Sequence, residues 1–226
     1  MKAVILAAGR GSRISAMSKG APKPLLRLLG LSLIERVILS ARESGISEFI
    51  IITGFQGEKI REELGSGEKY NVKITYIENE EWDRGNAISL LKAREVVDEP
   101  FLLFMCDHIF EPSVVDLLRN KFYGSREDRC LLVIDTSPPR YIDVEEATKV
   151  KTHGDRIVDI GKNLEDYDGV DCGLFLLTPT VFDAIEKSLK KGDDSLSGGI
   201  RVLSSKDLMG YVDIGGRFWI DIDTIE

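Results

Sequence analysis

Residues 2–13, which read KAVILAAGRGSR, join a run of apolar residues to a loop that contains two glycines. The apolar part, Lys2 to Ala8, predicts a buried strand. In open α/β sheets, ligands bind at the carboxyl ends of the strands, and backbone N–H groups of a small-residue loop can close on phosphates there. We therefore expect the loop that begins at Leu6 and ends at Arg13 to bind phosphate groups.

Two better-known phosphate-binding loops have a different spacing. A P-loop has Lys-Ser or Lys-Thr after its last glycine, and the dinucleotide fingerprint has a third Gly or Ala where Ile14 stands. The spacing therefore argues against a dinucleotide-dependent oxidoreductase, which stays a minor alternative.

Strand and helix patterns alternate over the first half of the chain. Patterns typical of strands lie at 48–53, 72–77 and 101–106, and patterns typical of helices at 32–44, 56–64, 86–97 and 112–120. This alternation predicts the α/β class, with a Rossmann-like, mainly parallel sheet covered by helices on both faces.

In the second half, strand patterns follow one another, at 130–136, 147–153, 156–160 and 170–178. The turn His153-Gly154-Asp155 predicts a hairpin, so we expect an antiparallel elaboration that makes the sheet mixed. No linker composition divides the chain, so residues 1–226 are expected to form one domain with two lobes, 1–125 and 126–226.

Composition excludes several classes of function. The three cysteines, Cys106, Cys130 and Cys172, are far apart, which argues against a disulfide framework or a zinc site and favours the cytoplasm. No apolar run approaches the roughly 20 residues that cross a bilayer. The net charge of −8 argues against a nucleic acid partner. One glutamine and five asparagines fit either a thermophilic source or compositional drift.

A lysine held between two prolines follows the glycine loop, in the segment Pro22-Lys23-Pro24. Proline fixes the backbone, so this lysine is pre-set to meet a triphosphate. Arg13 and Lys23 together offer a planar fork and a point charge that can neutralise a departing pyrophosphate. The alternative is a surface turn with a solvated lysine, and the two motifs in tandem favour phosphate binding.

Carboxylates at strand ends predict a Mg²⁺ site. Asp107 ends the most apolar strand pattern, which we expect at the centre of the sheet, with Asp107 at the same edge as the glycine loop. Mg²⁺ prefers oxygen ligands, and Asp221 and Asp223 alternate along a late strand, which makes them candidates for a second acid. The alternative for this pair is a solvated edge strand.

Two further polar positions, His108 and Asn86, leave more than one interpretation open. His108 could contact substrate or be a buried, hydrogen-bonded imidazole, while His153 is interpreted as a turn residue. Asn86, preceded by Gly85, could cap a helix or read the edge of a base.

Taken together, residues 6–13, 22–26, 107 and 219–224 resemble the sugar-nucleotide pyrophosphorylases and related nucleotidyltransferases. The resemblance implies the nucleotide-diphospho-sugar transferase fold, catalysis by Arg13, Lys23 and Asp107, and Mg²⁺ bound by Asp107 with Asp221 or Asp223. The nucleotide-binding residues that it implies are Leu6, Ala7, Ala8, Gly9, Gly11, Ser12, Arg13, Lys23, Gly54, Asn79, Gly85 and Asn86.

Within this family, residues 85–90, 106–109, 147–150 and 195–203 look like the inositol-1-phosphate cytidylyltransferases of thermophiles. The resemblance implies that CTP and inositol 1-phosphate give CDP-inositol and pyrophosphate, for synthesis of the osmolyte di-myo-inositol phosphate. Some of these enzymes are fused to a membrane-embedded transferase, so we expect that a domain could be missing after residue 226. Acceptor-binding roles fall to His108, Lys149, Lys162, Asp171 and Gly173.

Several questions stay open at this stage. Lys162 could instead be a lysine in an exposed turn. The ending Asp221-Ile222-Asp223-Thr224 also occurs in phosphocholine cytidylyltransferases, and a sugar 1-phosphate is a further possible acceptor. A nucleotide-sensing module without catalysis is the alternative of another class. Base preference and oligomeric state are not determined by these motifs.

Overall fold

A nine-stranded mixed sheet forms the centre of the molecule. The computed structural model describes residues 1–11, 20–124 and 129–222. The strands lie in the spatial order β5 (Lys73–Glu78), β4 (Glu48–Thr53), β1 (Ala3–Ala7), β6 (Phe101–Met105), β11 (Gly169–Leu177), β8 (Cys130–Asp135), β12 (Met209–Asp213), β10 (Arg156–Gly161) and β9 (Lys149–His153).

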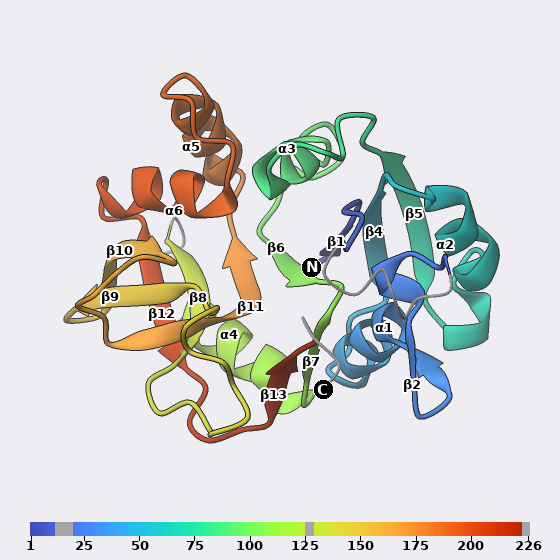
Figure 1. Cartoon of the computed structure of the whole chain (residues 1–226), viewed down its shortest axis with the longest axis horizontal. Helices are drawn as coiled ribbons and strands as arrows, with labels where there is room; N and C mark the ends of the chain where they lie inside the picture. The colour runs from blue at the N-terminus through green and yellow to red at the C-terminus, as the bar shows by residue number, and fades with distance from the viewer. Residues whose placement is uncertain (12–19, 125–128, 223–226) are drawn as a thin grey trace.

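The first four strands in this order are parallel, as the alternation of strand and helix patterns predicts. β11 is antiparallel to both of its neighbours, β6 and β8, and it joins the parallel part to the second half of the sheet. β9 and β10 form the predicted antiparallel hairpin around Gly154. The expected mixed α/β fold is therefore confirmed (Figure 1).

Helices cover both faces of the sheet (Figure 1). Ala3, Ile5 and Ala7 of β1 face a core that includes residues of α1 (Leu33–Glu43), α2 (Gly57–Leu64) and α4 (Ser113–Tyr123). Val4 and Leu6 face a second core with residues of α3 (Asn86–Leu91), α5 (Thr180–Leu189) and α6 (Leu196–Ser204). The continuous apolar run of β1 follows from this burial on two sides.

The helix predicted over 86–97 is α-helical only to Leu91. Beyond it, backbone N–H groups donate three residues back, from Ala93 to Leu90 and from Val96 to Ala93. The chain therefore continues as tighter turns, and Ala93 and Val97 still reach the core. The apolar spacing alone did not distinguish these turns from a longer α-helix.

Short elements lie between the main strands and helices. The 3₁₀-helix η1 (Lys23–Leu25) is followed by the small hairpin of β2 (Arg27–Leu28) and β3 (Leu31–Ser32), and η2 (Glu68–Tyr70) precedes β5. β7 (His108–Phe110) pairs antiparallel with β13 (Trp219–Asp221), which places Asp221 opposite His108. This pairing brings an acid from the end of the chain next to a histidine from the middle of the chain.

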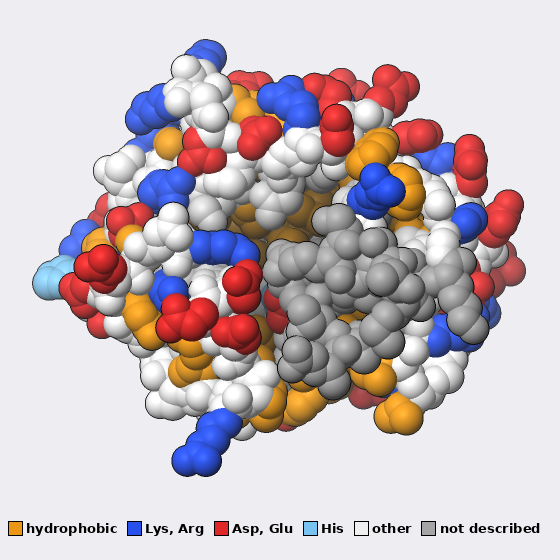
Figure 2. All heavy atoms as spheres, in the orientation of Figure 1, with side chains coloured by type: hydrophobic (Ala, Val, Ile, Leu, Met, Phe, Trp, Pro, Cys, Tyr) orange, Lys and Arg blue, Asp and Glu red, His pale blue; other side chains and the backbone are white. Residues whose placement is uncertain are grey.

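None of the helices in the described ranges is both long enough and apolar enough to cross a membrane. On the face seen in Figure 2, acidic and basic side chains are interspersed, and a hollow lies between the two halves of the molecule.

Candidate functional site

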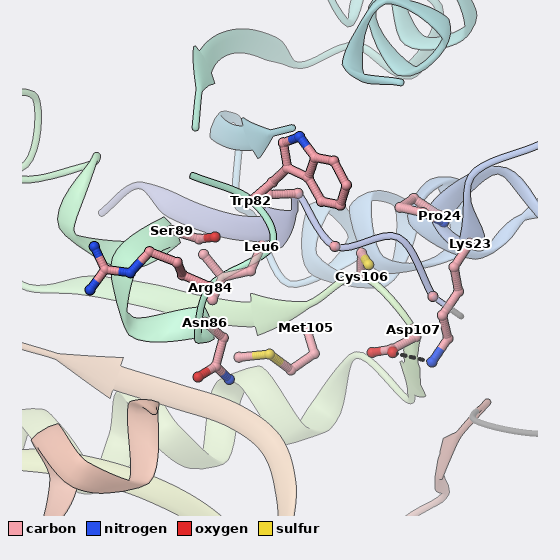
Figure 3. A pocket seen from close by; sticks show the side chains of 13 residues that line it. Leu6, Lys23, Pro24, Trp82, Arg84, Asn86, Ser89, Met105, Cys106 and Asp107 are labelled. Carbon is pink, nitrogen blue, oxygen red and sulfur yellow. Dashed lines mark hydrogen bonds and ion pairs between the residues drawn. The ribbon is translucent and has the colours of Figure 1, made fainter. Parts of the chain in front are cut away.

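A cavity of about 400 Å³ lies at the carboxyl ends of β1 and β6. β1 and β6 are parallel neighbours, so the glycine loop and Asp107 are delivered to the same edge, as predicted. Figure 3 shows side chains from both strands and from the start of α3 around this space. Its lining consists of Leu6, Ala8, Gly9, Gly11, Lys23, Pro24, Trp82, Arg84, Asn86, Ser89, Met105, Cys106 and Asp107.

Lys23 points to Asp107 across this cavity. Pro22 and Pro24 hold the lysine at the start of η1, and its Nζ lies 2.5 Å from Oδ2 of Asp107 (Figure 3). Gly11 packs on the lysine stem, since a Cβ at Gly11 would lie 2.5 Å from the Cβ of Lys23. The glycine loop and the Pro-Lys-Pro segment therefore form one unit.

Asp107, His108 and Asp221 converge beside this lysine. Each offers a ligand atom within 4.8 Å of those of the others. His108 Nδ1 lies 2.9 Å from Asp107 Oδ1 and 3.8 Å from Asp221 Oδ1, and the Ile222 N–H donates to the Asp107 carbonyl. Two carboxylates at this spacing are ligands that Mg²⁺ prefers.

Buried charges set the protonation of this cluster. Burial favours the neutral acid at Asp107, but His108 and Lys23 lower the pKa of this carboxyl below its ordinary value. Burial alone would lower the pKa of His108, yet Asp221, Asp107 and Asp171 raise it to about 9. In the ligand-free protein the cluster therefore holds two cations between carboxylates, a balance that a bound metal and polyphosphate would change.

The position of Asp221 depends on a buried tryptophan. Trp219, two residues earlier on β13, is 1% exposed, and its Nε1 donates to Oδ2 of Asp135 at 2.7 Å. Asp135 also accepts from the Ser137 N–H. This bond joins β13 to the end of β8, while the backbone pairing of β13 with β7 places Asp221 opposite His108.

A second cavity of about 610 Å³ opens from the same acids. It shares Asn86, Met105 and Asp107 with the first cavity, so the two spaces meet at Asp107. The predicted acceptor residues His108, Lys162, Asp171 and Gly173 all line it. Burial raises the pKa of Asp171 to about 6, although its carboxylate accepts a hydrogen bond from the Gly173 N–H.

Gly173 has the backbone conformation that only glycine adopts readily. Its φ is +74°, and a Cβ there would overlap the His108 ring, with Cγ of His108 only 2.8 Å away. The register of β11 against β8 shifts between Asp171 and Phe175, which gives the strand its local bend. Glycine at position 173 therefore leaves room for the His108 ring.

Two of the predicted binding residues, Asn79 and Lys149, are not among the residues that line the two cavities. Asn79 is fully buried, and its amide donates to Ser89 Oγ and accepts from the Glu81 N–H, so it does not line the cavity. Lys149 is buried too, and its Nζ donates to the Lys162 carbonyl at 3.1 Å. Lys149 therefore supports the acceptor loop and does not reach the acceptor cavity.

Ala7 and Gly54 are also absent from the cavity lining. The Ala7 side chain packs in the core, and Gly54 lets Trp82 pack closely, since a Cβ at Gly54 would lie 2.5 Å from the Cβ of Trp82. Sequence reasoning missed Trp82 itself, although one aromatic residue in an otherwise polar loop before Gly85 was a visible signal. Ser12, Arg13 and Asp223 lie outside the described residues.

The model of the nucleotidyl transferase family matches residues 2–226. This chain belongs to that family. The protein is 35% identical over 98% of its length to the bifunctional IPC transferase and DIPP synthase of Rubrobacter xylanophilus and 34% identical over 99% to that of Aquifex aeolicus. In each case the match covers 49% of the relative, so this nucleotidyltransferase spans about half the length of the curated relatives it matches.

Solved structures share the fold of this nucleotidyltransferase. The inositol-1-phosphate CTP transferase from T. maritima superposes with a TM-score of 0.84 and 28% identity, over 99% of this chain and 89% of the other. A UDP-glucose pyrophosphorylase in complex with UDP-glucose superposes with a TM-score of 0.82 over 99% of this chain and 93% of the other, and at 18% identity it supports the fold alone.

Proposed function

We propose that this nucleotidyltransferase is a Mg²⁺-dependent cytidylyltransferase that joins CTP to inositol 1-phosphate and releases pyrophosphate. The observation that carries the proposal is the meeting of two cavities at Asp107, one beside the glycine loop and one lined by Lys162 and Asp171. A donor in the first and an acceptor in the second would react where the cavities join. The relatives named for CTP and inositol 1-phosphate support this pair of substrates.

The reaction is an in-line displacement. An acceptor phosphate oxygen forms a bond to the α-phosphorus of CTP, and the bond from that phosphorus to the oxygen bridging to the β-phosphorus breaks. The acceptor phosphate is already anionic, so no side chain needs to remove a proton. Lys23 holds the triphosphate and neutralises charge that develops as pyrophosphate leaves. Arg13 would supply a second cation on the same phosphates.

Asp107 and Asp221 are the residues that would hold Mg²⁺, because their carboxylates converge and Trp219 anchors the second of them. When bound, the metal supplies charge neutralisation on the donor phosphates. Asp223 is an alternative ligand that we propose from the sequence alone.

The acceptor cavity fits a phosphorylated polyol. Lys162 supplies positive charge at one side of it, although its Nζ also lies 3.9 Å from Oε2 of Glu146 in the ligand-free protein. Carboxylates of Asp143 and Asp171 line the same space and can accept hydrogen bonds from hydroxyl groups. A ring with several hydroxyls and one phosphate uses both kinds of group.

The product would serve a second reaction that consumes CDP-inositol. The matched relatives carry a DIPP synthase function in their names and are about twice as long as this chain. We place the cytidylyl transfer in the cytoplasm, where CTP is made, and its use in synthesis of the osmolyte di-myo-inositol phosphate.

A pyrophosphate-release screen tests the proposal. CTP, UTP, dTTP, ATP and GTP are each paired with inositol 1-phosphate, phosphocholine and glucose 1-phosphate, with the Lys23→Ala variant as the inactive control. Release from CTP with inositol 1-phosphate, at least tenfold faster than from the other pairs, supports the assignment. A uridylyl or thymidylyl sugar product would overturn it. Saturable CTP binding with no release from any pair would favour the nucleotide-sensing module.

A further inference from the structure

The segments that begin α3 and α6 cap each other, although Gly85 and Asp194 are 109 residues apart in the chain. The Gly85 N–H donates to Asp194 Oδ2 at 3.0 Å, and the Ala87 N–H donates to the Asp194 carbonyl at 3.2 Å. In return, the Leu196 N–H donates to Oδ1 of Asn86 at 2.7 Å. We call these three hydrogen bonds the reciprocal cap.

The reciprocal cap requires close approach of two backbones. A Cβ on Gly85 would lie 2.6 Å from the carbonyl carbon of Asp194, and α3 has no capping side chain of its own at Gly85. The first turn of α3 therefore depends on Asp194 for hydrogen bonds that a local cap would otherwise supply. Arg84 adds charge to the contact, since its Nε lies 3.7 Å from Asp194 Oδ2.

The bond to Leu196 also fixes the direction of the Asn86 amide. A backbone N–H can only donate, so the atom of Asn86 that faces Leu196 is the oxygen. In Figure 3 the nitrogen of this amide lies on the side of Met105, which borders both cavities. Asn86 therefore caps α6 rather than the helix that it begins, and it also lines both cavities. Recognition of a base edge by its amide stays a prediction.

The contact continues from the reciprocal cap toward the acceptor loop. Asp193, beside Asp194, accepts from Nη2 of Arg201 at 2.6 Å, and Nη1 of Arg201 donates to the Ile160 carbonyl. Ile160 and Lys162 both line the acceptor cavity. Two sets of hydrogen bonds, joined by the backbone between Asp193 and Asp194, thus link the nucleotide cavity to the acceptor cavity.

We propose that Asp194 is a positioning residue that holds the two cavities at the spacing needed for transfer. The inference rests on the proposed function, since only a reaction between two bound substrates depends on that spacing. In-line attack needs the reacting atoms about 3 to 3.5 Å apart, and a misplacement of about 1 Å can cost on the order of 10²-fold in rate. The side chain of Asp194 is 42% exposed, so we expect its replacement to disturb the packing of the core little.

Three variants test the role of Asp194. Asp194→Ala removes the acceptor for the Gly85 N–H, whereas Asp194→Asn keeps an oxygen there. Asp168→Ala is the matched control, because Asp168 is 39% exposed, accepts from the Thr152 N–H and pairs with Lys151 at 3.2 Å, all away from the cavities. We expect kcat to fall about tenfold in Asp194→Ala with less than a threefold change in CTP affinity, and near-normal kcat in the other two variants.

Other results would overturn the positioning role. Normal kcat in Asp194→Ala would do so, as would an equal loss in the Asp168→Ala control. A loss of CTP affinity as large as the loss of kcat would place Asp194 in the nucleotide site itself. A lower melting temperature with unchanged kcat would leave only a structural contact.

A second readout needs no turnover and separates this inference from the proposed function. Hydrogen exchange of the peptide spanning residues 193–203 is measured with and without CTP. We expect CTP to slow this exchange in the wild type and not in Asp194→Ala, because the reciprocal cap connects α6 to the nucleotide cavity. Equal slowing in both proteins would refute the connection, whereas failure of wild-type turnover with inositol 1-phosphate would refute the proposed function alone.

Discussion

Replacing Gly173 by alanine tests how the acceptor cavity is built. Two costs add at this position. An L-residue in the left-handed region costs about 1–2 kcal/mol. The new Cβ would also overlap the His108 ring, and overpacking of this kind costs about 1–3 kcal/mol. We expect Gly173→Ala to lower the free energy of unfolding by about 2–5 kcal/mol, which for a chain of this length lowers Tm by roughly 4–20 °C.

Gly154→Ala provides the control for the backbone cost. Gly154 has a φ of +62° in the hairpin turn, and no atom lies within 4 Å of a Cβ built there. This variant therefore carries the first cost alone, and urea denaturation followed by circular dichroism should separate the two variants by about 1–3 kcal/mol. Equal destabilisation by the two substitutions would refute the claim that Gly173 makes room for His108.

The same substitution should change activity in a particular way. His108 must move if Gly173 carries a Cβ, and its 2.9 Å contact with Asp107 would be lost. Steady-state kinetics should show at least a tenfold lower kcat/KM for inositol 1-phosphate. CTP affinity should change less, because Gly173 and His108 line the second cavity and not the first.

Lys23→Ala should lower kcat by about 10²-fold or more with an unchanged circular dichroism spectrum, because a cation next to the departing pyrophosphate is lost; near-normal turnover would reject this role. Asp221→Asn should raise the Mg²⁺ concentration needed for half-maximal rate by about tenfold or more, and an unchanged requirement in a magnesium titration would point to Asp223. Tyr70→Phe should cost about 1 kcal/mol in urea denaturation, because the Tyr70 hydroxyl donates to Glu35 at 2.7 Å. Burial raises the pKa of Glu35, but hydrogen bonds from Ser32 and Tyr70 hold it below its ordinary value overall. The contribution of Glu35 to stability is therefore fully present above about pH 4.3 and is lost as the pH falls through the lowered pKa of this residue. If the Tyr70→Phe variant loses as much stability on acidification as the wild type, the assignment of this pH dependence to the bond between Tyr70 and Glu35 is contradicted.

The parallel half of the fold was predictable from sequence because its patterns are local. Apolar runs of strand length alternate with helical patterns, and parallel connection then places the glycine loop and Asp107 at one edge. Lys23 reaches the same edge because two prolines fix its backbone. The contact between Lys23 and Asp107, which are 84 residues apart, follows from these local features.

Other features depend on tertiary contacts that no local pattern reports. Asn79 is a polar residue in a polar stretch, yet Ser89 and the Glu81 N–H satisfy its amide inside the protein. Lys149 is drawn to the Lys162 carbonyl rather than to the cavity. The reciprocal cap joins segments from opposite halves of the chain, so neither segment alone predicts it.

Asp221 was predicted as a candidate ligand, but its surroundings were not. The pairing of β13 with β7 and the buried bond from Trp219 to Asp135 determine where this carboxylate points. A late strand of three residues carries too little pattern for sequence reasoning to place it.

The central claim is that acids from the middle and the end of the chain hold one metal against the donor phosphates. Crystals grown with CTP and Mn²⁺ in place of Mg²⁺ allow the metal to be located by anomalous scattering. We expect one peak in the junction of the two cavities, at about 2.1 Å from a carboxylate oxygen of Asp107 and of Asp221. A peak bound only by phosphate oxygens, or placed away from Asp107, would contradict the account.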